Sequence, residues 1–214
     1  MNDTASAPST APATKSRLKP GERRTQILQV LAAMLQEPGN ERITTAALAA
    51  RLQVSEAALY RHFASKAKMF EALMDFVEQS VLGLVQQIAG DDAVLGTLSA
   101  QEGRARAARI VAVLLQFSEK NPGMVRVMVG DALLGEHERL QVRMQQFFER
   151  IESILRQCLR PAAGALGSNI PTVEAQVAAS VLLSFAQGRL LRFVRSGFQR
   201  LPTAHLEPSL AMLV

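Results

Sequence analysis

The residues with the clearest chemical use lie at the end of one short stretch, Arg42 to Lys68. Leu59 and Phe63 stand four residues apart, so a helix would turn both toward a core and leave their neighbours free for a partner. Those neighbours combine two small side chains with phenol, guanidinium and imidazole groups: Ala57, Ala58, Tyr60, Arg61 and His62. Small side chains let a helix approach the bases closely, and basic side chains neutralise phosphates. This combination is typical of a helix that docks on duplex DNA.

Three capped helices must hold these residues in place. Thr44 and Thr45 can cap the first helix, and Ser55 caps the second, whose first turn carries a glutamate where the helix dipole favours negative charge. Ser65 caps the third. The few residues between the first and second helices match the length of a helix-turn-helix connection. We therefore predict a helix-turn-helix over about residues 44–63.

The charge of the chain supports DNA as the partner. Of a formal net charge of +5, residues 15–68 hold ten Lys and Arg against four Glu, residues 69–214 hold fourteen of each sign, and Asp3 supplies the remaining −1. The basic excess therefore surrounds the predicted helix-turn-helix, where it would release counterions from phosphates. Charge alone fits a solvated basic surface equally well, so its position beside the capped helices is what favours DNA.

The composition predicts an all-α protein. Helix-forming residues dominate, and no run alternates apolar and polar side chains for long enough to form a sheet. No apolar run approaches the ~18 residues that a membrane span needs, so we expect no membrane. The one cysteine, Cys158, cannot form an internal disulfide, which fits a reducing cytoplasm, and its apolar register predicts a buried side chain.

Three segments are expected along the chain. Residues 1–19 are predicted to be a disordered tail with a basic end, residues 20–75 a helix-turn-helix domain, and residues 76–214 a helical domain for dimerisation and partner binding. A first helix should run from about residue 22 to 37. A long helix from Ser65 to about residue 88 would join the two domains mechanically.

The second domain is predicted to consist of helices separated by Gly- and Pro-rich breaks. Helices are expected at 104–120, 124–135, 137–159 and 173–198 and after Pro202-Thr203, with weak signals over 90–103 and a loop over 161–167. Within 137–159, six apolar residues are spaced 4, 3, 4, 3 and 4 apart: Leu140, Met144, Phe147, Ile151, Ile154 and Cys158. This heptad seam fits a coiled coil or a packed helix hairpin.

The helix at 173–198 predicts a homodimer. Thr172 is expected to cap it, and from Val177 to Ala186 it is apolar nearly all round, so it must be covered on both sides. A second copy of the chain would supply the second cover, in a C2 interface built from the 137–159 and 173–198 helices of each subunit. The residues expected there are Phe147, Ile151, Val181, Leu182 and Phe185. The dimer would present two recognition helices to successive major grooves, about 34–36 Å apart.

The stretch ITTAALAARLQVSEAALYRHFASKAKMFEAL resembles the TetR family of transcription regulators, and its LYRHF…SK…MF pattern is specific. The resemblance implies a TetR-like fold, no enzymatic activity, and a homodimer on palindromic double-stranded DNA, with one dimer or more per site. It also implies that Thr44, Thr45, Tyr60, His62 and Lys66 contact phosphates or bases and that Ser55, Ala57 and Ala58 face base edges.

Further blocks resemble the nucleoid occlusion branch of that family, among them RRTQIL, QFFERIE, RFVRSGF and the turn KNPG that begins at Lys120. This resemblance implies a cytoplasmic, nucleoid-associated inhibitor of cell division that disrupts polymers of FtsZ, the tubulin-like division protein. The FtsZ tail would dock between the helix that starts at Ser65 and the helix that ends at Lys120. The implied contacts are Phe76, Val113, Lys120 and Asn121.

Two observations leave this groove open to a second interpretation. Leu84 stands where the nucleoid occlusion branch would have a basic residue, which departs from the pattern. Phe76 and Val113 also fit the core stripes of their helices, and Asn121 also fits a simple cap at the helix break.

Two other functions compete with this hypothesis. A TetR-like repressor released by a small apolar ligand would have the same composition, because an apolar pocket and a packed core are built from the same residues. An enzyme has little support, since the three histidines at 62, 137 and 205 are scattered and show no metal-ligand spacing. No metal or cofactor is expected.

Overall fold

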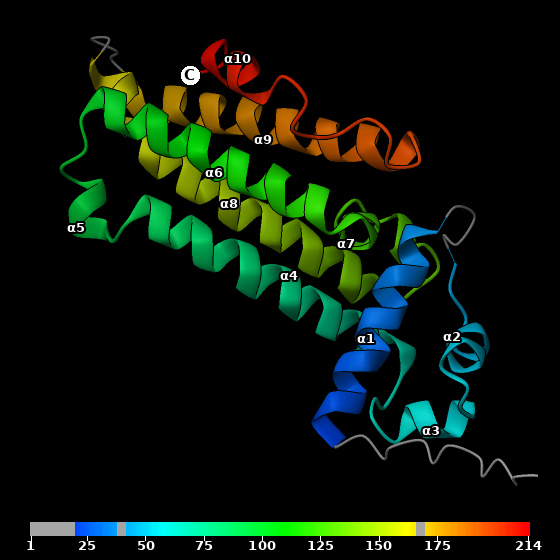
Figure 1. Cartoon of the computed structure of the whole chain (residues 1–214). Helices are drawn as coiled ribbons and strands as arrows, with labels where there is room; N and C mark the ends of the chain where they lie inside the picture. Colours follow the sequence, from blue (N-terminus) through cyan, green and yellow to red (C-terminus); the bar gives the residue numbers. More distant parts are fainter. Residues whose placement is uncertain (1–19, 38–41, 166–169) are drawn as a thin grey trace, which may run out of the picture.

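The computed structural model describes residues 20–37, 42–165 and 170–214, and these form helices and the turns between them, as predicted for an all-α protein. The tail at 1–19, the helix break at Pro38-Gly39 and the end of the 161–167 loop lie outside the described residues. Figure 1 shows α1, α2 and α3 at one end of the molecule and a bundle of long helices extending away from them.

The head is built from α1 (Pro20–Gln36), α2 (Thr45–Leu52) and α3 (Glu56–Tyr60), and α4 (Lys66–Ala89) runs from it into the bundle. The predicted caps are confirmed at Thr44, Ser55 and Ser65, whereas Thr45 is the first residue of α2. The hydroxyl oxygens of Thr44, Ser55 and Ser65 each accept a hydrogen bond from the main-chain N–H three residues on, at 3.1, 3.3 and 3.2 Å. Between α2 and α3 the chain turns through Gln53 in the left-handed conformation, with a φ of 54°.

The body follows as α5 (Asp92–Leu95), α6 (Ala100–Lys120), α7 (Pro122–Met128), the 3-10 helix η1 (Asp131–Leu133), α8 (Glu138–Ala165), α9 (Pro171–Arg195) and α10 (Leu206–Ala211). The segment 90–103, where the sequence pattern was weak, therefore contains the short helix α5 and the start of α6. That start lies four residues before the predicted Arg104, because Ser99 and Glu102 form a reciprocal capping box.

The prediction of a loop at 161–167 is wrong as far as Ala165, because α8 continues through Pro161. Proline in a helix removes one main-chain hydrogen bond and usually ends or kinks the helix. Here the next two residues, Ala162 and Ala163, are buried, so packing on the bundle offsets that loss.

Two predicted helix starts are also wrong. α9 begins at Pro171, whose fixed φ suits the first helical position, so Thr172 lies inside the helix and does not cap it. α10 begins at Leu206 rather than at Pro202-Thr203, directly after His205, which has a φ of 52°.

The described residues bury one continuous apolar cluster that reaches from Ile27 in α1 to Leu210 in α10. The heptad seam of α8 lies inside it: five of the six residues are buried and Ile154 packs against them, among α4, α6 and α9. The seam is thus the inner side of a packed helix, and the predicted burial of Cys158 is confirmed. By length and composition α9 would suffice to cross a membrane, yet eight of its residues are buried in this bundle.

Head and body meet at a second place besides α4. α1 packs along α7 (Figure 1), and Gly123 lies so close to Ala32 that an added Cβ would stand 2.1 Å from the Ala32 carbonyl oxygen. Any larger residue would push the two helices apart. The end of α6 and the start of α7 are therefore fixed directly against the head.

Candidate nucleic-acid and partner interfaces

The recognition face of α3 is turned outward. Leu59 and Phe63 are buried, as their spacing predicts. The five residues that this leaves for a partner are exposed or half-buried at the surface of the head: Ala57, Ala58, Tyr60, Arg61 and His62.

Hydrogen bonds join the start of α2 to α3. The Thr45 hydroxyl donates to Glu56 Oε2 at 2.6 Å, and the Tyr60 hydroxyl lies 3.5 Å from Thr45 Oγ1. Thr44 and Ser55 cap the two helices beside them. The structure thus brings four of the predicted site residues together on one polar surface, where hydroxyl groups can meet phosphate oxygens.

Arg24 of α1 supports this surface and was not predicted from the sequence. Its Nη1 donates to the His62 carbonyl oxygen at 3.0 Å, and its guanidinium lies 4.2 Å from the centre of the Phe63 ring. It therefore fixes the chain just after α3. The contact spans 38 positions in the sequence, so periodicity within one helix carries no sign of it.

Lys66, in the first turn of α4, is already paired. Its Nζ lies 2.5 Å from Glu136 Oε1, and the two side chains are only 28% and 16% exposed. The ammonium also lies 5.7 Å from the centre of the Phe70 ring. Glu136 belongs to the connection between η1 and α8, so this pair joins the head end of α4 to the body.

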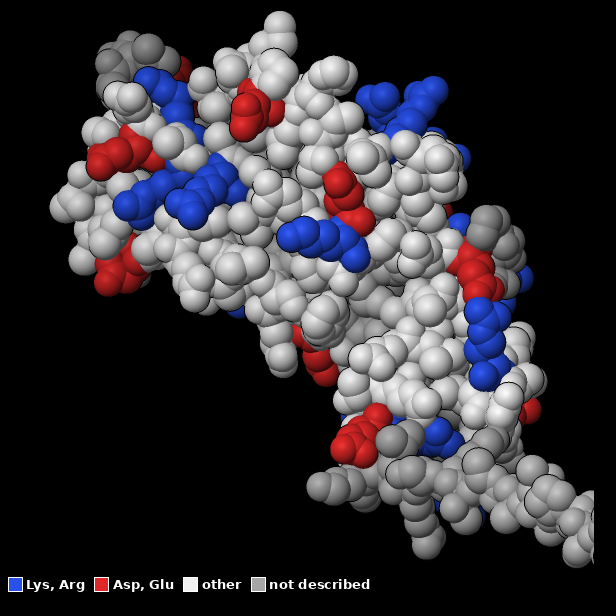
Figure 2. Space-filling view, viewed as in Figure 1, with Lys and Arg blue, Asp and Glu red and all other residues white. Residues whose placement is uncertain are grey.

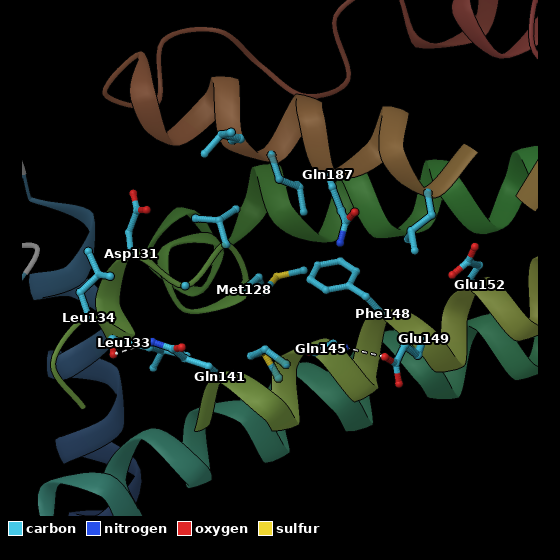
Figure 3. A pocket seen from close by; sticks show the side chains of 16 residues that line it. Met128, Asp131, Leu133, Leu134, Gln141, Gln145, Phe148, Glu149, Glu152 and Gln187 are labelled. Carbon is cyan, nitrogen blue, oxygen red and sulfur yellow. Dashed lines mark hydrogen bonds between the residues drawn. The ribbon is translucent and has the colours of Figure 1, made fainter. Parts of the chain in front are cut away.

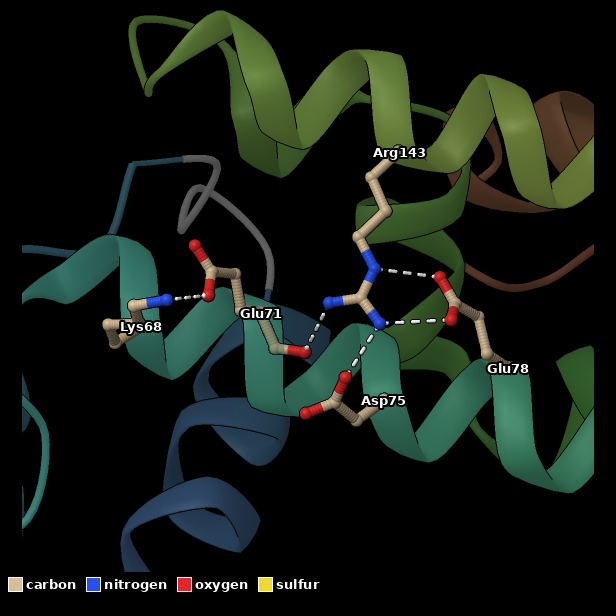
Figure 4. A network of polar contacts seen from close by, with 5 residues as sticks. All are labelled: Lys68, Glu71, Asp75, Glu78 and Arg143. Atoms are coloured by element: carbon tan, nitrogen blue, oxygen red, sulfur yellow. Dashed lines mark hydrogen bonds and ion pairs between the residues drawn. The ribbon is translucent and has the colours of Figure 1, made fainter.

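Arg143 of α8 binds α4 one step further from the head (Figure 4). Its guanidinium donates to both carboxylate oxygens of Glu78, at 2.8 and 2.9 Å, and to Asp75 at 2.6 Å. These hydrogen bonds, above all the two that Glu78 accepts, hold the pKa of Arg143 above its ordinary value. The bidentate geometry fixes α8 along α4.

Glu71 occupies the position between these two contacts. Lys68 donates to it within α4 at 2.5 Å (Figure 4), and Arg139 of α8 approaches it to 2.8 Å. The hydrogen bond from Lys68 is the first cause that lowers the pKa of Glu71, and the nearby Arg139 and Arg143 add to it. α4 is therefore joined to α8 and to the connection before it by a ladder of ion pairs, which we define as Lys66–Glu136, Glu71–Arg139 and Asp75/Glu78–Arg143.

The partner groove is predicted between α4 and α6, and the structure shows where its expected residues lie. Phe76 is 48% exposed, and its ring lies 6.0 Å from that of Phe117 on α6, so Phe76 is not a core residue. Val113 is half-buried, and Leu84 is 45% exposed. Figure 2 shows this face of the molecule, with basic side chains over α6 and mostly uncharged atoms over α4.

The two polar residues of the groove stand at the end of α6. Lys120 is exposed in its last turn. The side-chain amide of Asn121 donates to the Phe117 carbonyl oxygen at 2.8 Å, so it does close the helix end. The cap interpretation of Asn121 therefore fits, and the residue lies directly beside Phe117 and Lys120.

Three of the residues expected at the dimer interface face the inside of their own subunit. Phe147, Ile151 and Leu182 are fully buried by the single chain, so their side chains cannot reach across to a partner. The reason is that α8 and α9 each use their most apolar side within the bundle. Of the other two, Phe185 is half-buried with Arg189 4.6 Å from its ring centre, and Val181 is 48% exposed.

The apolar surface that remains open on α9 is a stripe of valines spaced four apart, Val173, Val177 and Val181. A cavity of about 660 Å³, open to the surface, is lined by residues of α7, η1, α8 and α9. Its apolar lining includes Met128, Leu133 and Phe148, and glutamine and glutamate side chains stand along it (Figure 3).

Two chemical possibilities can be judged from the described residues. Within 20–37, 42–165 and 170–214, no three His, Cys, Asp or Glu side chains come together in a way that could hold a metal ion. Burial raises the pKa of the Cys158 thiol to about 11, so this cysteine stays a neutral thiol at physiological pH.

Comparison with known proteins gives matches in both parts of the chain. Residues 27–73 match the family described as "Bacterial regulatory proteins, tetR family", and residues 101–214 match the SlmA-like "Tetracyclin repressor-like, C-terminal domain". Among solved structures, the chain is similar to the TetR family transcriptional regulator PfmR from Thermus thermophilus, with a TM-score of 0.68, 19% identity and coverage of 88% and 96% of the two chains. At this identity the likeness establishes the fold.

Much greater sequence similarity is found with nucleoid occlusion factors. The chain is 52% identical to the nucleoid occlusion factor SlmA of Idiomarina loihiensis over 183 residues, which cover 86% of this chain and 89% of the relative. It is 47% identical to SlmA of Colwellia psychrerythraea over 186 residues, with coverage of 87% and 89%. The chain belongs to the SlmA nucleoid occlusion factors, a group within the TetR family of bacterial regulatory proteins.

Proposed function

We propose that this protein is a cytoplasmic, nucleoid-associated inhibitor of cell division that binds palindromic chromosomal sites and FtsZ together and disrupts FtsZ polymers. The observation that carries the proposal is the extent of the identity with SlmA proteins, about half of all residues across head and body. A repressor with another effector would share the head and diverge in the body. The same membership supports a non-enzymatic role.

The head would bind duplex DNA through its polar surface. Thr44, Thr45 and Tyr60 would meet phosphates at the starts of α2 and α3, with His62, Arg61 and Lys66 beside them. Ser55, Ala57 and Ala58 would face base edges. Support comes from the outward orientation of these groups and from the excess of basic residues in this part of the chain.

The FtsZ tail would dock in the groove between α4 and α6. Phe76 provides an exposed aromatic ring packed on the half-buried Phe117, Val113 an apolar neighbour, and Lys120 with Asn121 a polar end. A cation beside an exposed aromatic ring suits an acidic peptide with an apolar anchor. Leu84 makes the α4 side of the groove more apolar than the branch pattern predicts.

A second copy of the chain would cover α8 and α9. The exposed valine stripe of α9 offers apolar contact area, and the cavity lined by α7, η1, α8 and α9 combines apolar with polar side chains, as subunit interfaces do. Two heads on one C2 dimer match the symmetry of a palindromic site.

Sedimentation of FtsZ polymers tests the proposal. Purified FtsZ is polymerised with GTP and pelleted with this protein, with and without the palindromic duplex that the protein selects from a randomised pool. The pelleted fraction should fall, and more so with the duplex present. The Lys120→Glu variant serves as the matched control and should leave the polymers intact. If wild-type protein with its duplex has no effect on the pellet, the ligand-released repressor becomes the better account.

A further inference from the structure

The Lys66–Glu136 pair is placed where the head would meet DNA. We propose that Glu136 is an internal competitor for the phosphate backbone: in the free protein it occupies Lys66, and DNA binding must exchange the carboxylate for a phosphate. The inference rests on the proposed DNA binding of the head. It assigns Glu136 of the body an autoinhibitory contact.

The start of α4 favours an anion. Its first turn contains no acidic residue and carries two lysines, Lys66 and Lys68, although a helix N-terminus stabilises negative charge. Lys68 is satisfied within α4 by Glu71. Lys66 takes its partner from the body, 70 positions away in the sequence.

Glu136 is held ready for this contact. Its main-chain N–H donates to the Leu133 carbonyl oxygen at 3.0 Å, and Gly135 before it has a φ of 79°, which turns the chain sharply after η1. Only 16% of the Glu136 side chain is exposed, so water reaches its carboxylate poorly and Lys66 is its main charged partner. A pair of this kind is screened less by salt than one on an open surface.

The ladder between α4 and α8 makes the exchange selective. In the other two ion pairs the cation lies on α8 and the carboxylates lie on α4. In those pairs α4 therefore offers no cation that a DNA phosphate could bind. Only the first rung places its cation on α4, at the head. A phosphate can therefore release Glu136 while Arg139 and Arg143 keep α8 in place.

The affinity for DNA of four variants tests this inference. The probe is the labelled palindromic duplex that wild-type protein selects, measured by fluorescence anisotropy. Glu136→Gln should bind about threefold to tenfold more tightly than wild type, since Lys66 no longer has to leave a partner. Lys66→Ala should bind more weakly, and Lys66→Ala/Glu136→Gln should bind no better than Lys66→Ala.

Glu138→Gln is the matched control, because it removes the same charge two residues further along at an exposed position. It should change affinity much less than Glu136→Gln. A gain from Glu136→Gln that persists without Lys66, or that Glu138→Gln reproduces, would overturn the exchange and point to general repulsion. Equal affinity of Glu136→Gln and wild type would also overturn it. If no variant, wild type included, binds duplex DNA, the proposed DNA binding itself fails.

Discussion

The side-chain amide of Asn121 donates to the main-chain carbonyl of Phe117, at 2.8 Å. The same residue thus closes α6 and stands beside the aromatic pair of the partner groove. Lys120 lies between Phe117 and Asn121 in the sequence. Because the hydrogen bond between those two residues fixes the end of α6, the ammonium group of Lys120 projects from a fixed position. This explains how a lysine at the terminus of a helix can offer a defined charge to a peptide.

Lys120→Glu should therefore abolish binding of the FtsZ tail and leave DNA affinity unchanged. The substitution reverses the charge offered to an acidic peptide, and Lys120 is exposed in the last turn of α6, a helix that lies apart from α3 (Figure 1). Anisotropy of labelled FtsZ tail and of labelled duplex measures both. Gln116→Glu, one turn earlier at another exposed position of α6, is the matched control. Undiminished tail binding by Lys120→Glu would remove this residue from the interface.

Tyr60→Ala should lose most DNA binding and, with it, most of the inhibition of FtsZ. α4 begins at the head and carries Phe76 in the body, so both ligands can favour the same position of this helix. Coupling of this kind is reciprocal and typically amounts to about 1–3 kcal/mol. Tail affinity should rise when duplex is added to wild type and stay constant when it is added to Tyr60→Ala. An equal rise in both would refute the coupling.

Ala57→Leu should change which bases the protein prefers. Ala57 is exposed at the start of α3, and a larger side chain would alter how closely the helix approaches base edges. On the wild-type site we expect a loss of about 1–3 kcal/mol, the usual cost of one mismatched contact. Selection from a randomised duplex pool reads the new preference, with the exposed Ala33→Leu on α1 as control. An unaltered motif would place Ala57 away from the bases.

Val177→Asp should dissociate the homodimer without unfolding the subunit. Val177 is 58% exposed on the valine stripe of α9, so a carboxylate there is hydrated in the monomer and loses water only at the interface. Sedimentation velocity reports the oligomeric state, and circular dichroism reports folding. Val94→Asp on α5, where the valine is 36% exposed, should remain dimeric. A dimeric Val177→Asp variant would move the interface elsewhere.

Cys158 should resist thiol reagents until the protein unfolds. Its pKa is raised to about 11 by burial, whereas an unfolded thiol titrates near 9, so little reactive thiolate forms in the folded state. The raised pKa also means that stability is maintained below pH 9 and falls as the pH rises toward 11. Reaction with a chromogenic disulfide at pH 8, with and without denaturant, measures the accessibility. Rapid labelling of folded protein would contradict the prediction.

Sequence reasoning located the caps of the head well, because a cap depends on a few adjacent residues. Ser55 and Ser65 are examples. It failed where packing decides: Pro161 stays within α8 because the residues after it are buried. It also named Leu182 as an interface residue, since an apolar helix does not reveal which of its sides its own subunit covers.

The long-range polar contacts lay beyond sequence reasoning altogether. Lys66 was predicted as a DNA contact, but its pairing with Glu136 spans 70 positions and depends on the turn after η1. Arg24 of α1 likewise reaches the main chain of His62, which lies after α3 and 38 positions away in the sequence. No periodicity links such residues, so only the three-dimensional arrangement brings them together.

The approach of Gly123 to Ala32 has a consequence for the DNA itself. Because the main chains of α1 and α7 are in contact at that point, the head is packed rigidly against the body. The separation of two heads in a dimer is then a property of the rigid bodies and not of a flexible tether. If the protein binds a palindromic site as the proposed dimer, this rigid contact would fix the number of base pairs that must separate the two half-sites.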